Sequence, residues 1–195
     1  YMKKITLIFL FLSITTAHAQ IRDFSEKGNG LVNLERHQFT INLLGPGIRY
    51  ELGLFKNVSA STSFTPAFAR YQEGYALGFA WHTRIRYYHN FQERLDVNKN
   101  TVGNSANYFG PARSIFWEPV QFTDNISDGN SNYAFAFYGG VYGVQRTNRK
   151  GFNFNGEIGY GYFRGDGLDN GHGFMVNLNF GWVATKRKST KPTFD

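Results

Sequence analysis

Charged and amide side chains recur at every second position in four segments of this sequence, and they are the residues best placed to do chemistry. Side chains two positions apart point to the same face of a β-strand, so each segment presents one polar face. Arginine and glutamate on such faces can form ion pairs, while asparagine and histidine can complete the hydrogen bonds. The set comprises Arg49, Glu51, His82, Arg84, Arg86, Asn153, Asn155, Glu157, Asn177 and Asn179.

Catalysis or metal binding would need a further constellation, for which the histidines are the candidates. His172 lies near Asp166 and Asp169, which could orient it or bind a cation, but segment 165–171 is also typical of a flexible polar loop. This segment lacks the ligand spacing of a calcium-binding EF-hand loop, and the chain has no Gly-x-Ser-x-Gly nucleophile motif. We therefore expect no catalytic residue, no metal site and no cofactor.

The positions between the polar residues are apolar and rich in aromatic rings, which predicts strands with two unlike faces. We expect eight strands, at 38–44, 48–54, 58–69, 75–88, 107–117, 133–145, 152–162 and 174–184. Pro66 cannot donate to a strand ladder, so we expect a bulge or a strand end there, and Pro111 makes the fifth strand the least regular. Segment 90–106 is expected to be a long polar connection, and 120–131 and 165–173 are expected to be loops.

The aromatic excess bears on where the strands lie, because 20 Phe, 12 Tyr and 3 Trp fall largely in the alternating segments. Alternation says only that the two faces differ, so it fits either a membrane barrel or a soluble barrel with its apolar face inside. Amphipathic rings favour membrane interfaces. Together with the N-terminal export signal described below, they favour the membrane barrel. The aromatics expected to face lipid or its interface are Phe79, Trp81, Tyr87, Phe154, Tyr160, Phe180 and Trp182.

The predicted fold is thus all-β, an eight-stranded antiparallel up-and-down transmembrane β-barrel. Eight strands leave an interior just wide enough for side chains to fill. The polar set is therefore expected to form a packed lumen network rather than a pore. Because an unpaired buried charge is costly, we expect the arginines to pair with Glu51 and Glu157 across the lumen, with further acceptors supplied by water or loop residues.

The N-terminus reads as an export signal. Lys3 and Lys4 precede an apolar run at 5–14, and small residues at 17–19 form a cleavage site before Gln20. Tyr1, which precedes the apparent start at Met2, is interpreted as an artefact. The resulting organisation is a signal peptide at 1–19, a periplasmic segment at 20–37, the barrel at 38–184 and a basic tail at 185–195.

Composition excludes several classes of protein. The chain has no cysteine, so it has no disulfide framework and no thiolate metal site. The formal charge of +7 is partly concentrated in a C-terminal tail that carries Lys186, Arg187, Lys188 and Lys191. Export denies access to nucleic acid, so we expect no nucleic-acid partner and interpret the tail as a solvated basic segment facing anionic envelope polymers.

Three groups of residues carry a resemblance to a known family. They are 86–91 (RYYHNF) followed by 99–101 (KNT) and 103–109 (GNSANYF), then 140–146 (GVYGVQR), and then 156–162 (GEIGYGY). In order and spacing, residues 37–184 resemble small outer-membrane β-barrel proteins common in Bacteroidota, a family that is mostly uncharacterised. Residues 98–100 replace that family's Gly-Lys-Asn, and the tail after Ala184 departs from barrels that end on an aromatic residue. The resemblance implies the eight-stranded barrel and no activity.

These observations predict a non-enzymatic envelope structural or surface-interaction protein of the outer membrane. Its expected partners are outer-membrane lipid, lipopolysaccharide and the barrel-assembly machinery. With both chain ends in the periplasm, 45–47, 70–74, 120–131 and 165–173 would face the cell surface. Two alternatives stay open at this point, namely a soluble secreted small-ligand carrier of lipocalin type and a lipid-modifying barrel enzyme.

Overall fold

The structure is a computed structural model that describes residues 34–70, 72, 74–124, 135–165 and 169–185. The expected signal peptide, most of the expected periplasmic segment and most of the basic tail lie outside these residues. So do Asp166 and the greater part of the predicted loop at 120–131. No helix among the described residues is long and apolar enough to cross a membrane.

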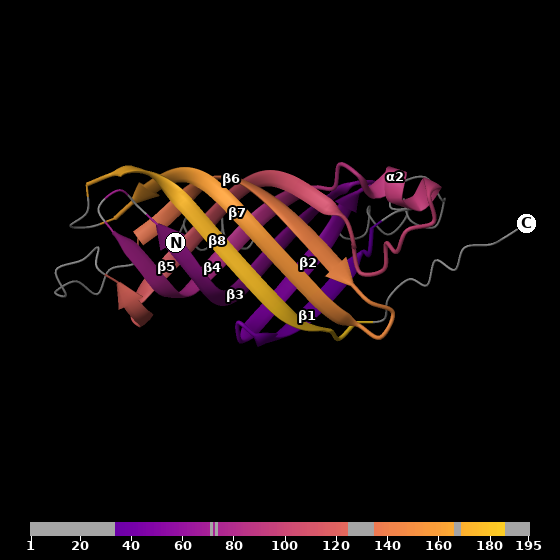
Figure 1. The fold of residues 1–195 in the computed structure, drawn as a ribbon, viewed down its shortest axis with the longest axis horizontal. Helices are drawn as coiled ribbons and strands as arrows, with labels where there is room; N and C mark the ends of the chain where they lie inside the picture. Colours follow the sequence, from indigo (N-terminus) through magenta and orange to yellow (C-terminus); the bar gives the residue numbers. More distant parts are fainter. Residues whose placement is uncertain (1–33, 71, 73, 125–134, 166–168, 186–195) are drawn as a thin grey trace, which may run out of the picture. The chain divides into compact units, whose positions relative to one another are not determined.

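The described chain is an antiparallel ring of eight strands (Figure 1). The strands are β1 (His37–Leu44), β2 (Gly47–Phe55), β3 (Val58–Arg70), β4 (Tyr75–Tyr87), β5 (Asn107–Asp124), β6 (Phe135–Thr147), β7 (Phe152–Arg164) and β8 (Gly171–Val183). Each strand pairs with the next in sequence, and β1 pairs with β8 to close the ring. The predicted eight antiparallel strands are therefore confirmed.

Alternation of inward and outward side chains explains why these segments are strands. Along β4, each buried residue is followed by an exposed or half-exposed one over all thirteen positions. The inward positions of β4 run from Ala76 to Arg86, and the outward positions include Trp81 and Ile85. A strand with this pattern has two separate surroundings, the inside of the ring and its outer face.

The two strands of the β1–β2 hairpin are shorter than the other six strands of the ring. Its turn lies near the middle of the ring's length, where Gly45 approaches Pro66 of β3 and Leu178 of β8 (Figure 1). Beyond the turn, β3 pairs directly with β8, with Phe68 opposite Val176. The ring thus has eight strands toward one end and six toward the other. The turn at 45–47 therefore stops short of the end of the ring at which β3 connects to β4.

Pro66 lies where β3 changes its partner. The ladder of β3 with β2 ends at Phe64, and the ladder with β8 begins at Phe68. The pairing with β4 runs through Pro66 without a register shift. The prediction of a bulge or strand end at Pro66 is therefore wrong, because the missing donor falls where one neighbouring ladder stops and another starts.

The width of the ring decides which side chains fill it. The eight-strand half holds long polar side chains, whereas the six-strand half holds small and apolar ones, because fewer strands enclose a narrower interior. The apolar group comprises Ala67, Ala69, Ala76, Ala80, Ala112, Phe116, Phe137, Val141, Phe163 and Met175. The expected packed polar lumen thus occupies only part of the interior.

Strand limits differ from the sequence-based ones by more than two residues in two places. β5 continues through Pro111 to Asp124, so residues 120–124 are strand rather than loop. The extension is irregular because the register with β4 shifts. Phe116 pairs with Ala80 and Gln121 pairs with Gly78, so β5 advances five residues while β4 advances two. β8 begins at Gly171 rather than Phe174, which pairs His172 with Tyr162 of β7.

The connection between β4 and β5 closes the eight-strand end. It contains a short helix, α2 (Phe91–Asp96), that the sequence did not predict (Figure 1). Phe91 packs in a small apolar cluster with Tyr88, Tyr108, Leu34 and Ala106. These contacts give a segment of polar composition its own apolar anchor.

Close approach of β6 and β7 gives a test of the narrow half. A Cβ on Gly139 would lie 2.7 Å from the Cα of Gly161, whereas a Cβ on Gly140 would meet nothing within 4 Å. We expect Gly139→Ala to lower the free energy of unfolding by about 1–3 kcal/mol through overpacking. We expect Gly140→Ala to change it by less than about 0.5 kcal/mol. Urea unfolding followed by tryptophan fluorescence measures both, and equal midpoints would contradict the narrowing of the interior.

Candidate functional site

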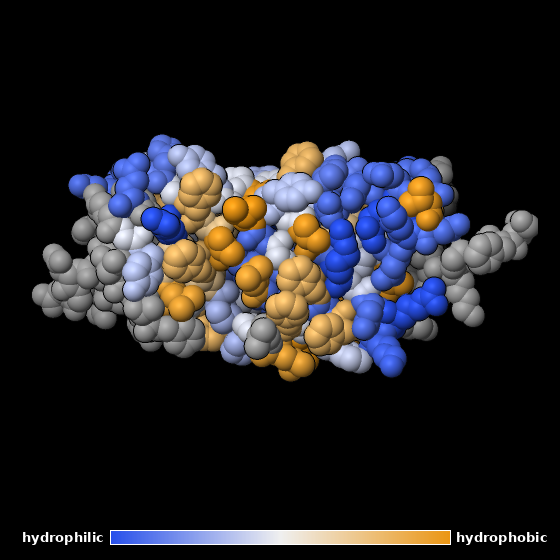
Figure 2. All heavy atoms as spheres, in the orientation of Figure 1, coloured by the Kyte–Doolittle hydropathy of each residue, from blue (hydrophilic) through white to orange (hydrophobic). Residues whose placement is uncertain are grey.

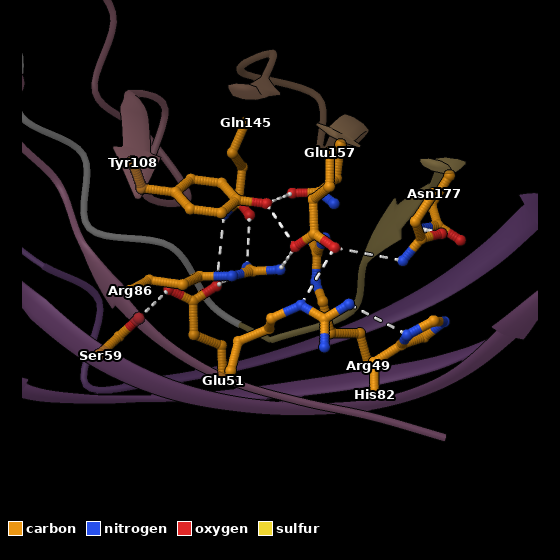
Figure 3. A network of polar contacts seen from close by, with 12 residues as sticks. Arg49, Glu51, Ser59, His82, Arg86, Tyr108, Gln145, Glu157 and Asn177 are labelled. Atoms are coloured by element: carbon orange, nitrogen blue, oxygen red, sulfur yellow. Dashed lines mark hydrogen bonds and ion pairs between the residues drawn. The ribbon is translucent and has the colours of Figure 1, made fainter. Parts of the chain in front are cut away.

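The buried polar network in the eight-strand half is the candidate site (Figure 3). All ten polar residues singled out in the sequence are buried inside the ring, none more than 3% exposed. They come from β2, β4, β7 and β8, which place them on the inner face by strand alternation. Tyr108, Gln145, Ser59 and Ser114 join them from β5, β6 and β3.

Arg86 is at the centre of this network. Its guanidinium binds Glu51 of β2 at 3.1 Å and Glu157 of β7 at 2.9 Å, so it links strands from different parts of the ring. It also donates to the side-chain oxygen of Gln145 at 3.1 Å and lies 4.4 Å from the centre of the Tyr108 ring. Figure 3 shows Arg86 between the two carboxylates, with Tyr108 alongside.

Arg84 is held mainly by neutral acceptors and one carboxylate. Its Nε donates to Glu157 at 3.3 Å, and its other nitrogens donate to the Arg113 carbonyl at 2.7 Å and to Ser114 Oγ at 3.0 Å. Arg84 also approaches His82 Nδ1 at 3.1 Å. Since a guanidinium can only donate, His82 Nδ1 accepts and its proton is on Nε2.

Arg49 differs from the other two arginines. It donates to Asn153 Oδ1 at 2.7 Å and, at 3.5 Å, to Thr40 Oγ1, and it forms no ion pair with any residue that the structure describes. Its Nε and Nη1 are buried without a hydrogen-bond partner among the same residues. The expectation that the arginines pair with the two glutamates therefore holds for Arg84 and Arg86 and is wrong for Arg49. The buried network thus contains three guanidinium groups, of Arg49, Arg84 and Arg86, and two carboxylates, of Glu51 and Glu157.

Glu51 accepts hydrogen bonds from five side chains, the longest from Gln145 at 3.5 Å. It accepts from Arg86, from Ser59 Oγ at 2.7 Å and from the Tyr88 hydroxyl at 2.6 Å. The fourth donor is Asn104 Nδ2 at 2.9 Å, from the connection that closes the ring. Burial, and to a lesser degree the charge of Glu51, raises the pKa of Tyr88 well above its ordinary value, so its hydroxyl stays protonated and donates.

Asparagines complete the network around Glu157. Asn177 donates to Glu157 at 3.4 Å, and Asn179 donates to Asn177 at 2.7 Å. The Tyr108 hydroxyl lies within hydrogen-bond distance of Asn155 Oδ1, at 2.8 Å, and of Glu157 Oε1, at 2.7 Å. Sequence reasoning missed Tyr108 and Gln145, although both stand at inward positions of strands whose alternation could have shown it.

Asn104 is the residue of the network that the sequence could least reveal. It follows Gly103 in a pair of left-handed residues, with φ of 58° at Gly103 and 56° at Asn104. This turn aims the Asn104 amide at Glu51, while its Oδ1 accepts from the Glu35 backbone at 2.7 Å. The Gly103 carbonyl accepts from Gln145 at 2.9 Å, so the connection is tied to the network at two points.

The aromatic residues expected on the outer face all lie there. Trp81, Tyr87, Tyr160 and Trp182 are 43–55% exposed, and Phe79, Phe154 and Phe180 are half-buried among neighbouring outward rings. Phe154 and Phe180 contact each other with ring centres 4.8 Å apart.

The histidines that could have served catalysis are not brought together. His82 is inside the ring with its Nδ1 2.7 Å from Ser114 Oγ, whereas His172 lies on the outer face against the rings of Tyr160 and Tyr162. Within the described ranges, no group of three His, Cys, Asp or Glu side chains could hold a metal ion.

Comparison with known proteins adds no relative to this picture. No family model, no curated protein and no solved structure matches the chain. The buried charges of the network connect β2, β4 and β7, which makes the network a clamp on the closed ring.

Removing a carboxylate from this network should be costly. Glu157→Gln keeps the size of the side chain but leaves Arg84 without its carboxylate partner and Arg86 with Glu51 alone. We expect a loss of about 3–5 kcal/mol in the free energy of unfolding, the usual cost of breaking a buried ion pair. Glu93→Gln, on the exposed surface of α2, is the control and should leave the unfolding midpoint unchanged. Equal midpoints for the two variants would show that the network does not clamp the ring.

Asn104 allows a test of the connection itself. Asn104→Gly keeps the left-handed backbone but removes both hydrogen bonds of the side chain, which should cost about 1–3 kcal/mol. The connection should then open more often, so trypsin should cut faster after Arg94 and Lys99. Asn98→Gly is the matched control, because Asn98 is also left-handed, with φ of 54°, but is exposed. Equal cleavage rates would show that Asn104 does not hold the connection in place.

Proposed function

We propose that this chain is an integral outer-membrane β-barrel that serves the envelope as a non-enzymatic structural or surface-interaction protein. The observation that carries the proposal is the inversion of the ring. Large apolar side chains face outward, while arginine and glutamate are buried inside. A protein folded in water normally shows the reverse arrangement.

The outward apolar residues occur on every strand. They include Leu43, Ile48, Phe68, Leu77, Ile85, Phe109, Tyr138, Ile158, Phe174, Leu178 and Trp182, each 37–69% exposed. In the space-filling view, apolar side chains gather over the middle of the visible face, and hydrophilic ones predominate toward the end that carries α2 (Figure 2). An apolar surface of this extent needs a partner, and a lipid bilayer would cover it on all sides.

Strand length and closure support the same proposal. β3, β4, β6, β7 and β8 each have 13 residues, and about 9–11 residues of tilted strand span a bilayer. In a closed ring every strand has two neighbours, so the backbone groups are hydrogen-bonded without water. The resemblance of the sequence to small outer-membrane barrels agrees with these features.

The described interior argues against a soluble ligand carrier. Such a carrier would keep its aromatic face inward around an apolar cavity, but here that face is outside. The centre of the eight-strand half is filled by buried charged side chains, with Arg86 between two carboxylates. This interior suits a rigid support for the loops better than a container for an apolar ligand.

The orientation that we propose places α2 and both chain ends in the periplasm. The connections after β3, β5 and β7 would then face the cell surface, beside lipopolysaccharide, and would be the sites for partner binding. The barrel-assembly machinery would insert the chain. The α2 end, closed by the connection that binds Glu51, would be the periplasmic end of a plugged barrel.

Fractionation of expressing cells tests the proposal. We expect the protein in the outer-membrane fraction, with unboiled protein migrating differently from boiled protein in SDS gels, because a closed barrel resists SDS.

In the same cells, an epitope tag after Asn98 should resist external protease while a tag at Asn170 is cleaved. Soluble protein in the periplasm or medium would overturn the membrane location, and cleavage of the Asn98 tag alone would invert the orientation.

A further inference from the structure

An apolar groove runs along the outer face of β1 to β5. Its volume is about 410 Å³, and its walls include Phe39, Ile48, Tyr50, Phe64, Trp81 and Trp117. These residues come from five adjacent strands, so the groove belongs to the wall of the ring and is separate from the buried network.

Polar groups at the groove are already bound to other side chains. Trp81 Nε1 donates to Thr62 Oγ1 at 2.8 Å, and the Tyr50 hydroxyl lies 2.6 Å from His37 Nδ1. The Trp81 indole N–H and the Tyr50 hydroxyl are therefore already engaged, and an occupant meets mainly ring faces and aliphatic carbon. Such a wall favours hydrocarbon over any peptide segment with backbone groups to satisfy.

The rings that form the walls brace one another. Phe64 stacks on Phe79 with ring centres 5.2 Å apart, and Trp81 meets Trp117 edge to face at 6.1 Å. Phe64 also contacts Trp117 at 6.0 Å. Aromatic pairs of this kind stabilise one another beyond the area that they bury, so the groove keeps its shape when it is empty.

The position of the groove indicates which part of a membrane would reach it. One end is near Tyr50, which is tied to His37 at the first residue of β1 on the α2 side. The other end is at Trp117, near the middle of β5. The groove thus runs from the α2 end toward the middle, along one half of the ring.

The turn beside the groove has the composition of an apolar environment. Gly45, Pro46 and Gly47 bring no polar side chain, and Pro46 has no backbone N–H to satisfy. Leu43 and Ile48 flank the turn and are 69% and 52% exposed. The turns at the α2 end are instead polar, with Lys56 and Asn57 after β2 and residues 148–151 (NRKG) after β6. A turn that stops in the middle of the ring and carries no polar side chain suits the apolar layer of a membrane.

From these observations we propose that the groove binds one acyl chain of a membrane phospholipid, with the headgroup at the α2 end. The inference rests on the proposed membrane location and adds a lipid site to it. A single hydrocarbon chain can lie along the groove and contact the rings on both sides, which a flexible chain does by dispersion alone. A second copy of the ring presents a convex outer face, which does not enter a groove of this shape.

Native mass spectrometry of the protein extracted from outer membranes tests the site. We expect the wild-type protein to keep one phospholipid at collision energies that strip detergent. Ile48→Trp should fill the groove and lower the lipid-bound fraction at least tenfold. Ile158→Trp on β7 is the matched control, because Ile158 is 53% exposed against 52% for Ile48, and it should leave the bound fraction unchanged.

A second measurement covers loss of lipid during extraction. The Trp182→Phe variant keeps the two groove tryptophans, Trp81 and Trp117, as its only indoles. In vesicles of dibrominated phosphatidylcholine its fluorescence should fall, and Ile158→Trp tested in a Trp81→Phe/Trp117→Phe/Trp182→Phe background should fall less. Equal quenching at the two places, equal lipid retention by the two isoleucine variants, or a mass of two copies would each overturn the lipid site. Failure to enter vesicles at all would instead overturn the membrane location.

Discussion

The ion pairs of Arg86 with Glu51 and Glu157 are the interaction on which the rest of this structure depends. One guanidinium from β4 reaches carboxylates on β2 and β7, so the contact exists only when the ring has closed. All three groups are almost completely buried, and a buried charge without its partner is strongly unfavourable. Closure of the backbone ring and pairing of the buried charges are therefore one constraint. Glu51 also accepts hydrogen bonds from Ser59, Tyr88 and Asn104, which offset the cost of burying its charge.

Strand number sets where such a network can exist. With eight strands the interior has room for arginine and tyrosine, and with six it has room for alanine, glycine and a few large apolar rings. The short β1–β2 hairpin decides where the change occurs, and Pro66 marks the point on β3 where one partner gives way to another. The connection with α2 closes the wide end, where a plug is needed, while the narrow end is filled by its own side chains.

The regular part of this architecture could be predicted from the sequence, and the irregular part could not. Strict alternation set His82, Arg84 and Arg86 on one face of a strand, and the structure has all three inside the ring. Alternation carries no information about ring width, so the apolar half of the interior was not foreseen. The role of Asn104 depends on a left-handed turn within a connection, and the lone position of Arg49 depends on pairing across the ring. Both are properties of distant contacts, which period and composition do not encode.

Different interactions stabilise the inner and the outer face of each strand. Inside the wide half, folding gains little from removing apolar surface from water, because the buried side chains are polar and must have their hydrogen bonds replaced. Outside, the apolar side chains gain stability only when something other than water covers them. On the proposed membrane location, lipid supplies that cover, and ring closure supplies the partners for the charges. Neither gain is available to the open chain in water, so insertion and closure would have to occur together.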